Sequence, residues 1–139
     1  MRTTAFPRDT EIDGALDASP LVALEGELSA IFGGRPVVAC AGGAVAASMA
    51  LRLAGLGHDP ALIEVAIPSV GATVAARAAL EADWRVLPID VDADTGNVSP
   101  RALSSAIGER TRALVVTHLF GHPATMPDLL RLAERYQLA

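Results

Sequence analysis

At 139 residues, 51% of them apolar, the chain can fill the core of one domain, and its net charge of −5 excludes nucleic-acid binding through a clustered basic face. No apolar run reaches the roughly 18 residues that a membrane span needs, and the N-terminal stretch lacks the apolar core of a secretory signal. Composition therefore predicts a soluble, cytoplasmic protein with neither a nucleic-acid nor a membrane partner.

The first expected elements are a flexible arm over residues 1–18 and a helix after it. Residues 1–18 are polar, charged and without apolar periodicity. The helix begins at Ser19 and Pro20, a typical cap and first position, and ends before Gly33, since its apolar residues recur at helical spacing. A first strand over residues 37–40 follows.

Helix and strand patterns then alternate. Residues 44–53 predict a helix, residues 64–67 a strand, and residues 75–80 another helix. A third strand is expected over residues 85–91. Because Pro88 has no amide hydrogen to donate, it places that strand at an edge of the sheet or at a local break in the ladder.

The second half of the chain continues the alternation. An acidic turn over residues 90–96 leads to Ser99, a predicted N-cap, and to a helix over residues 101–107. A buried strand is expected over residues 114–117 and a last helix over residues 127–136. Short strands alternating with helices indicate right-handed crossovers and a parallel sheet with flanking helices on both faces. The fold class is therefore predicted to be α/β.

A glycine turn joins the expected strand over residues 37–40 to the next helix. Gly42 and Gly43 let the backbone pass close to a ligand, and the first amides of the helix, with the positive end of its dipole, would face an anion such as a phosphate. A plain strand-to-helix connection explains the same residues. The turn alone leaves both interpretations open.

Several stretches together resemble the DegT/DnrJ/EryC1/StrS family of sugar aminotransferases. The most specific are DVDADTGN followed by a helix, and HLFGHPATM. Family members are fold-type-I enzymes that use pyridoxal phosphate (PLP), so the resemblance implies a partial, truncated large domain of that fold over residues 19–139. The stretches that carry it are LEGELSAIFGG (24–34), VVACAGGAVAASMALRLAGLG (37–57), EVAIPS (64–69), VLPIDVDADTGNVSPRALSSAI (86–107) and RTRALVVTHLFGHPATMPDL (110–129).

The resemblance implies a mechanism that this polypeptide cannot complete alone. In the family, a lysine holds the cofactor aldehyde as an imine, and an aspartate pairs with the pyridine nitrogen and keeps the ring protonated. All eleven basic residues here are arginines, whose guanidinium group stays protonated and forms no imine. The aspartate and the lysine that the resemblance implies both lie beyond residue 139. We therefore expect no catalytic residue within the chain.

Two cofactor contacts of the family fall inside the chain. Gly42, Gly43 and Ala44 match the turn that binds the phosphate of PLP, but Ala44 stands where a threonine hydroxyl is usual. Ala72 stands where an aromatic ring usually stacks on the cofactor, and a methyl group cannot replace a contact of about 1 kcal/mol or more. The cofactor-binding candidates are therefore Gly42, Gly43, Ala44 and Ala72, with both side-chain contacts weakened.

The sheet that the resemblance implies raises a structural question. Its first strand, residues 37–40 here, lies beside strands that the chain does not contain. Such a strand would expose unpaired backbone groups. We therefore expect the chain to pair differently, to bind a partner or to fold poorly.

The remaining polar candidates are predicted to be structural. His118 could act as an acid or base, but its place after an apolar strand favours a satisfied structural histidine, and His122 before a proline favours a turn. Asp92 and its acidic neighbours could bind a cation; a solvated turn explains them without further oxygen ligands, and no metal site is predicted. Cys40 could be reactive near a helix N-terminus but is expected to be a small buried residue.

The large aromatic residues and one serine complete the candidates. Trp84, Phe120 and Tyr136 are expected in the core rather than in a ligand platform. Ser69 could hydrogen-bond a ligand, or it could belong to a helix cap.

Three hypotheses about function follow. The first is the N-terminal part of an aminotransferase-like domain that works with a partner chain supplying the aspartate and the lysine. The second is a catalytically inactive binding or scaffolding subunit, which Ala44 and Ala72 favour. The third is a remnant without function. Whether the chain belongs to an active enzyme stays open, and its expected partners are a homo-oligomer or a complementing protein chain.

Overall fold

The computed structural model describes residues 18–139, and these belong to two units whose boundary lies between Cys40 and Ala41. Each unit is described by itself. Apart from Ala18, which begins a helix, the predicted arm lies outside the described residues. Among the described residues, no helix has the length and apolar character that crossing a membrane requires.

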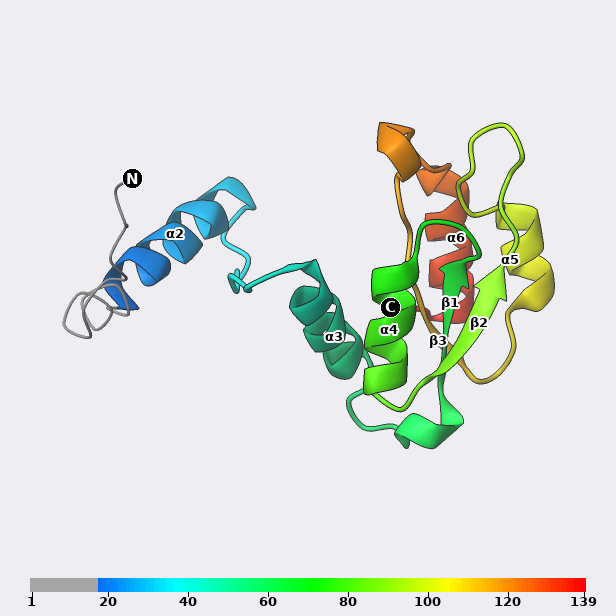
Figure 1. Ribbon diagram of the computed structural model, residues 1–139, viewed down its shortest axis with the longest axis horizontal. Coiled ribbons are helices and arrows are strands. Elements are labelled where there is room, and N and C mark those ends of the chain that lie inside the picture. The colour runs from blue at the N-terminus through cyan, green and yellow to red at the C-terminus, as the bar shows by residue number, and fades with distance from the viewer. Residues whose placement is uncertain (1–17) are drawn as a thin grey trace, which may run out of the picture. The chain divides into compact units, whose positions relative to one another are not determined.

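The described part of the first unit contains helix α2, Ala18–Ile31, which confirms the expected helix (Figure 1). The strand predicted over residues 37–40 is wrong, because this segment has no assigned strand and no β-pairing partner among the described residues. One side-chain contact holds it within the unit: the amide of Ala39 donates to Glu25 Oε1 at 2.8 Å. Apolar β-branched residues alone do not make a strand, since a strand is stable only in a ladder with a neighbour.

The second unit alternates helices and strands in the expected order. Its sheet has three strands, all parallel. Helices lie on both sides of this sheet (Figure 1). Each predicted helix of this unit is present. In chain order the elements are α3 (Gly43–Ala54), the 3₁₀ turn η1 (Pro60–Leu62), β1 (Glu64–Pro68), α4 (Thr73–Glu81), β2 (Arg85–Ile89), α5 (Pro100–Ala106), β3 (Thr111–Leu114), the 3₁₀ turn η2 (Leu119–Gly121) and α6 (Met126–Tyr136).

The sheet has the order β2-β1-β3, with every neighbouring pair parallel. Strand β2 is therefore an edge strand, and Pro88 lies in it opposite Ile67 of β1. An edge position tolerates a residue without an amide hydrogen. This confirms the edge placement that Pro88 predicted.

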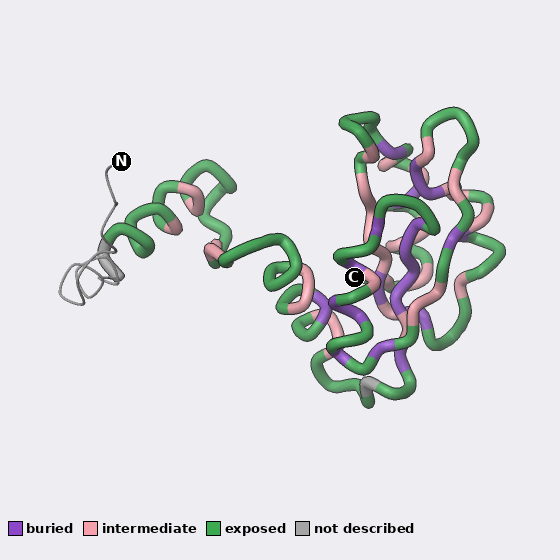
Figure 2. The backbone as a smooth tube through the Cα atoms, in the orientation of Figure 1, coloured by how far each residue is buried: buried purple, intermediate pink, exposed green. Residues whose placement is uncertain are grey.

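The two faces of the sheet carry separate apolar cores. Figure 2 marks the buried stretches of this unit along the backbone. Successive strand residues point to opposite faces. Val65 and Ile67 of β1 therefore pack with α3 and α4, together with Trp84, whose side chain is in the core as predicted. Ala66 lies on the opposite face and packs with Leu103 of α5 and α6. The α/β class and the doubly covered parallel sheet are confirmed.

Strand β3 begins three residues earlier than the sequence predicted. It covers Thr111–Leu114, whereas residues 114–117 were expected. The polar Thr111 is nearly fully buried and donates from Oγ1 to Glu64 Oε1 at 2.7 Å, which ties the start of β3 to the start of β1. After Leu114, the Val115 amide still donates to Ala66 O at 2.9 Å, but the following residues leave the ladder.

Candidate functional site

The predicted cofactor-binding residues lie at the start of two neighbouring helices. Helices α3 and α4 pack against each other. Both begin at the edge of the sheet toward which β1 and β2 run (Figure 1). In parallel α/β folds the carboxyl edge of the strands is where ligands bind, because loops and helix N-termini gather there.

Helix α3 presents unbonded amides at this edge. Its first intrahelical hydrogen bond runs from the Ala46 amide to Gly42 O at 3.1 Å, so the amides of Gly43, Ala44 and Val45 have no acceptor within the helix. Gly42 is extended, and neither Gly42 nor Gly43 has a heavy atom near the position of a Cβ. The turn is thus exposed to solvent, and amides at a helix N-terminus are the kind of donor that binds anions in proteins. Ala44 adds no hydroxyl donor.

Ala72 is placed at the start of the other helix. It is the N-cap of α4 and is only 7% exposed, and its carbonyl accepts from the Ala76 amide at 2.9 Å. Its methyl group lines a hollow of about 340 Å³ that also contacts Ser69 and Pro88. Ser69 does not cap α4, since Ala72 occupies that position; its amide donates to Ile89 O at 2.9 Å.

The DVDADTGN stretch forms a turn built on one carboxylate. Asp92 Oδ1 accepts hydrogen bonds from the amides of Asp94 and Thr95 and from Thr95 Oγ1, each at 3.1 Å. This is the turn role that the sequence predicted for the acidic cluster. Helix α5 then begins after Ser99, whose Oγ accepts from the Ala102 amide at 3.3 Å, as expected of an N-cap.

Asn97 joins this turn to the HLFGHPATM loop, a role that the sequence analysis missed. It is 2% exposed. Its Nδ2 donates to His122 O at 3.0 Å, and its Oδ1 accepts from the Leu119 amide at 3.0 Å. We call this pair of bonds the Asn97 clamp. The only sequence signal for the clamp was an asparagine at the end of a short acidic turn, shortly before an N-cap.

Leu119 packs where two glycines leave room. A Cβ at Gly71 would lie 2.6 Å from Leu119 Cδ1, and one at Gly96 would lie 2.8 Å from Leu119 Cδ2. Both glycines also have positive φ, +78° and +68°, which side chains rarely adopt. The loops that follow β1, β2 and β3 are therefore fixed to one another at the carboxyl edge.

Predictions for the other residues of the HLFGHPATM loop are confirmed for two histidines and wrong for one phenylalanine. His118 Nδ1 accepts from the Ala124 amide at 3.0 Å, which is the structural role predicted. His122 follows the 3₁₀ turn η2, as its turn role predicted. Phe120 contradicts the prediction, because it is 95% exposed at φ +52°. Leu119 is held beneath the loop by its packing, so the next side chain of the tight turn projects outward.

Two further side-chain predictions concern Cys40 and Tyr136. Cys40 is half-buried rather than buried, and its thiol donates to Val38 O at 3.8 Å. Tyr136 is also half-buried, with the Arg135 guanidinium carbon 5.5 Å from its ring centroid.

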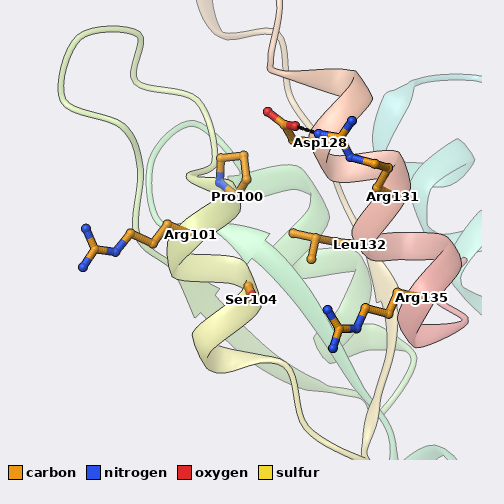
Figure 3. Close-up of a pocket in the computed structure, with 7 residues that line it drawn as sticks. All are labelled: Pro100, Arg101, Ser104, Asp128, Arg131, Leu132 and Arg135. Carbon is orange, nitrogen blue, oxygen red and sulfur yellow. Dashed lines mark hydrogen bonds and ion pairs between the residues drawn. The ribbon is translucent and has the colours of Figure 1, made fainter.

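A larger hollow lies elsewhere, between α5 and α6 (Figure 3). It has a volume of about 510 Å³ and includes none of the predicted site residues. Asp128 and Arg131 form an ion pair at its rim, and Arg101 points away from α6. It is a solvent-facing groove between two helices.

The residues of this chain fit one end of PLP. The exposed amides at the start of α3 suit its phosphate, whose charge the helix dipole favours. At the position predicted to stack on the ring, Ala72 offers only a methyl group, and the sequence contains no lysine to bind the aldehyde. The chain therefore fits the phosphate and does not fit the ring or the aldehyde.

Comparison with known proteins places the chain in a family. The model of the DegT/DnrJ/EryC1/StrS aminotransferase family matches residues 16–139. A UDP-N-acetyl-3-dehydro-alpha-D-glucosamine 3-aminotransferase of Acidithiobacillus ferrooxidans is 33% identical over 116 residues, 84% of this chain and 31% of that protein. A dTDP-3-amino-3,4,6-trideoxy-alpha-D-glucose transaminase of Streptomyces venezuelae is 36% identical over 91 residues, 66% of this chain and 24% of that protein.

The fold comparison agrees. The crystal structure of 3-amino-5-hydroxybenzoic acid synthase superposes on 99% of this chain with a TM-score of 0.77 and 27% identity, and this chain covers 38% of it. The chain thus spans about a third or less of its curated relatives named above. By its sequence match and its fold, the chain belongs to the DegT/DnrJ/EryC1/StrS aminotransferase family.

Proposed function

We propose that this chain is the N-terminal part of the large domain of a PLP-dependent sugar aminotransferase and transaminates only with polypeptide outside these 139 residues. The observation that carries the proposal is that this chain belongs to the family and has amides without an intrahelical acceptor at the start of α3, but contains no lysine. The complementing polypeptide supplies the aspartate for the pyridine nitrogen and the lysine for the aldehyde. The proposal places the assembly in the cytoplasm.

The chain contributes binding and positioning to this assembly. When bound, PLP supplies the electron sink for transamination. The amides of Gly43, Ala44 and Val45 hold the phosphate, and the Asn97 clamp keeps the surrounding loops in place. The chain holds no group that moves the substrate proton.

The test compares the chain alone with a reconstituted assembly. The second component is the part of the S. venezuelae transaminase that follows the region matched by this chain. We expect the chain alone, mixed with PLP and borohydride, to gain no pyridoxyl group on any side chain and to show no transamination. Activity should appear only in the mixture. Transamination by the isolated chain would refute the proposal.

A catalytically inactive binding subunit is the second candidate, and Ala44 and Ala72 favour it. Neither offers the side-chain contact to PLP that the family resemblance implies. If an assembly forms but stays inactive, and Ala44→Thr with Ala72→Tyr restores PLP binding and turnover, the second candidate is supported. Activity of the assembly without these changes would exclude it.

A further inference from the structure

The groove between α5 and α6 gathers positive charge on an acidic chain (Figure 3). The whole sequence has 16 acidic residues and 11 arginines, but this groove is lined by three arginines and one aspartate. Its volume of about 510 Å³ is large enough for a small molecule. The groove is therefore a candidate anion site, and it is separate from the residues predicted to bind PLP.

One face of α6 supplies two of the three arginines. Residues three and four apart share a helix face, and the groove is lined by four residues of α6 at this spacing: Asp128, Arg131, Leu132 and Arg135. The ion pair with Asp128 holds Arg131 at the groove. Arg135 has its guanidinium carbon 5.5 Å from the ring centroid of Tyr136, and Figure 3 shows its side chain extending from α6 toward α5. Both guanidinium groups can therefore reach an anion in the groove.

The charges on this face of α6 are only partly compensated. Arg131 and Arg135 lie one turn apart, and like charges at that spacing destabilise a helix slightly. Asp128 is paired with Arg131, whereas neither Arg101 nor Arg135 has an ion pair recorded with another residue of 18–139. A bound anion would remove this repulsion, so the arrangement favours an anionic ligand.

Helix α5 forms the other side of the groove through Pro100, Arg101 and Ser104. The exposed hydroxyl of Ser104 can donate a hydrogen bond to an anion. Arg101 points away from α6, but exposed side chains change rotamer within nanoseconds, so its guanidinium group can turn toward a ligand. Pro100 and Leu132, both half-buried, add apolar surface for an uncharged part of the ligand.

We propose that the groove between α5 and α6 binds a small molecule that carries a diphosphate group. A guanidinium group can donate to two phosphate oxygens at once, so Arg131 and Arg135, one turn apart, each hold one phosphoryl group. Ser104 donates from the opposite side, and Arg101 adds a third positive charge. This inference goes beyond the proposed function, because it involves neither PLP nor transamination.

The test is an NMR titration of the full chain with pyrophosphate at constant ionic strength. We expect the amide shifts to concentrate at Ser104, Arg131 and Arg135. Arg131→Gln and Arg135→Gln should each weaken binding by about tenfold or more, because each removes a charged hydrogen-bond donor. Arg77→Gln is the matched control and should leave the affinity unchanged. It also breaks a one-turn ion pair, with Glu81, but on α4, which packs on the opposite face of the sheet.

The outcomes separate this site from the predicted phosphate turn. Shifts confined to residues 43–45, with Arg131→Gln and Arg135→Gln binding as tightly as the unaltered chain, overturn the groove proposal and leave the proposed function standing. Equal weakening by Arg77→Gln overturns it too, because the loss then reflects net charge alone, and so does the absence of binding. ADP provides the last comparison: tighter binding than pyrophosphate, lost in Arg135→Gln, supports a ligand whose uncharged part contacts Pro100 and Leu132.

Discussion

The Asn97 clamp makes a stability prediction that can be worked out from its contacts. Asn97→Ala removes the donor to His122 O and the acceptor for the Leu119 amide, both at 3.0 Å. Each such bond contributes about 0.5–1.5 kcal/mol net, so their sum is about 1–3 kcal/mol. Because Leu119 and His122 are partly open to water, their backbone groups can rehydrate. We therefore expect a loss of about 2 kcal/mol in the free energy of unfolding.

Urea unfolding measures this change, and a slope of about 2 kcal/mol per molar converts it to a midpoint about 1 M lower. Exchange of the Leu119 amide should rise together with the loss of stability. Ser105→Ala is the control, since it removes an exposed hydroxyl that donates to Arg101 O within α5, and it should change the free energy of unfolding by about 0.5 kcal/mol or less. A cost for Asn97→Ala as small as the change for Ser105→Ala, with unchanged Leu119 exchange, would refute the clamp.

Two further predictions concern packing and capping. Gly55→Ala would place a methyl group against the buried ring of Trp84 and should lower the free energy of unfolding in urea by about 1–3 kcal/mol. Gly108→Ala is the control, because open space surrounds Gly108, and it should be neutral or stabilising. Equal effects of the two variants would contradict the packing of Gly55 on Trp84. Ser99→Ala removes the acceptor for the Ala102 amide and should lower stability by about 1 kcal/mol, with a smaller helical signal in circular dichroism. An unchanged unfolding midpoint would mean that this bond contributes nothing.

The sequence predicted correctly those features that depend on a single residue and its immediate neighbours. Pro88 lacks an amide hydrogen whatever surrounds it, so its edge position could be inferred from one residue. Ser99 before a proline indicated the start of α5 for the same kind of reason. The alternation of elements then determined the parallel sheet, because crossovers between parallel strands are long and right-handed.

The wrong predictions concern segments whose structure depends on contacts with residues distant in the sequence. Residues 37–40 have the composition of a strand, but no strand is assigned there and the sheet of the described residues does not include them. A strand is stable only within a ladder, which the local sequence does not supply. Strand β3 begins with Thr111 and Arg112, polar residues that hide the strand pattern, and it ends at Leu114, after which only the Val115 amide still donates to β1. Phe120 was placed in the core by residue type alone, whereas a tight turn exposes it.

The sequence predicted which residues belong to the candidate site, but it did not predict the contacts that hold the surrounding loops together. The two stretches that make the family resemblance most specific meet through Asn97 and Leu119, and their contacts fix loops rather than a ligand. A chain can therefore keep these stretches because its fold needs them, with no selection on the cofactor. In the proposed function the phosphate of PLP is held at α3 by backbone amides, so Ala44 lacks the hydroxyl donor of a threonine and leaves the amide donors in place. Ala72 offers no substitute for a stacked ring, which makes it the position that best separates an enzyme part from an inactive subunit.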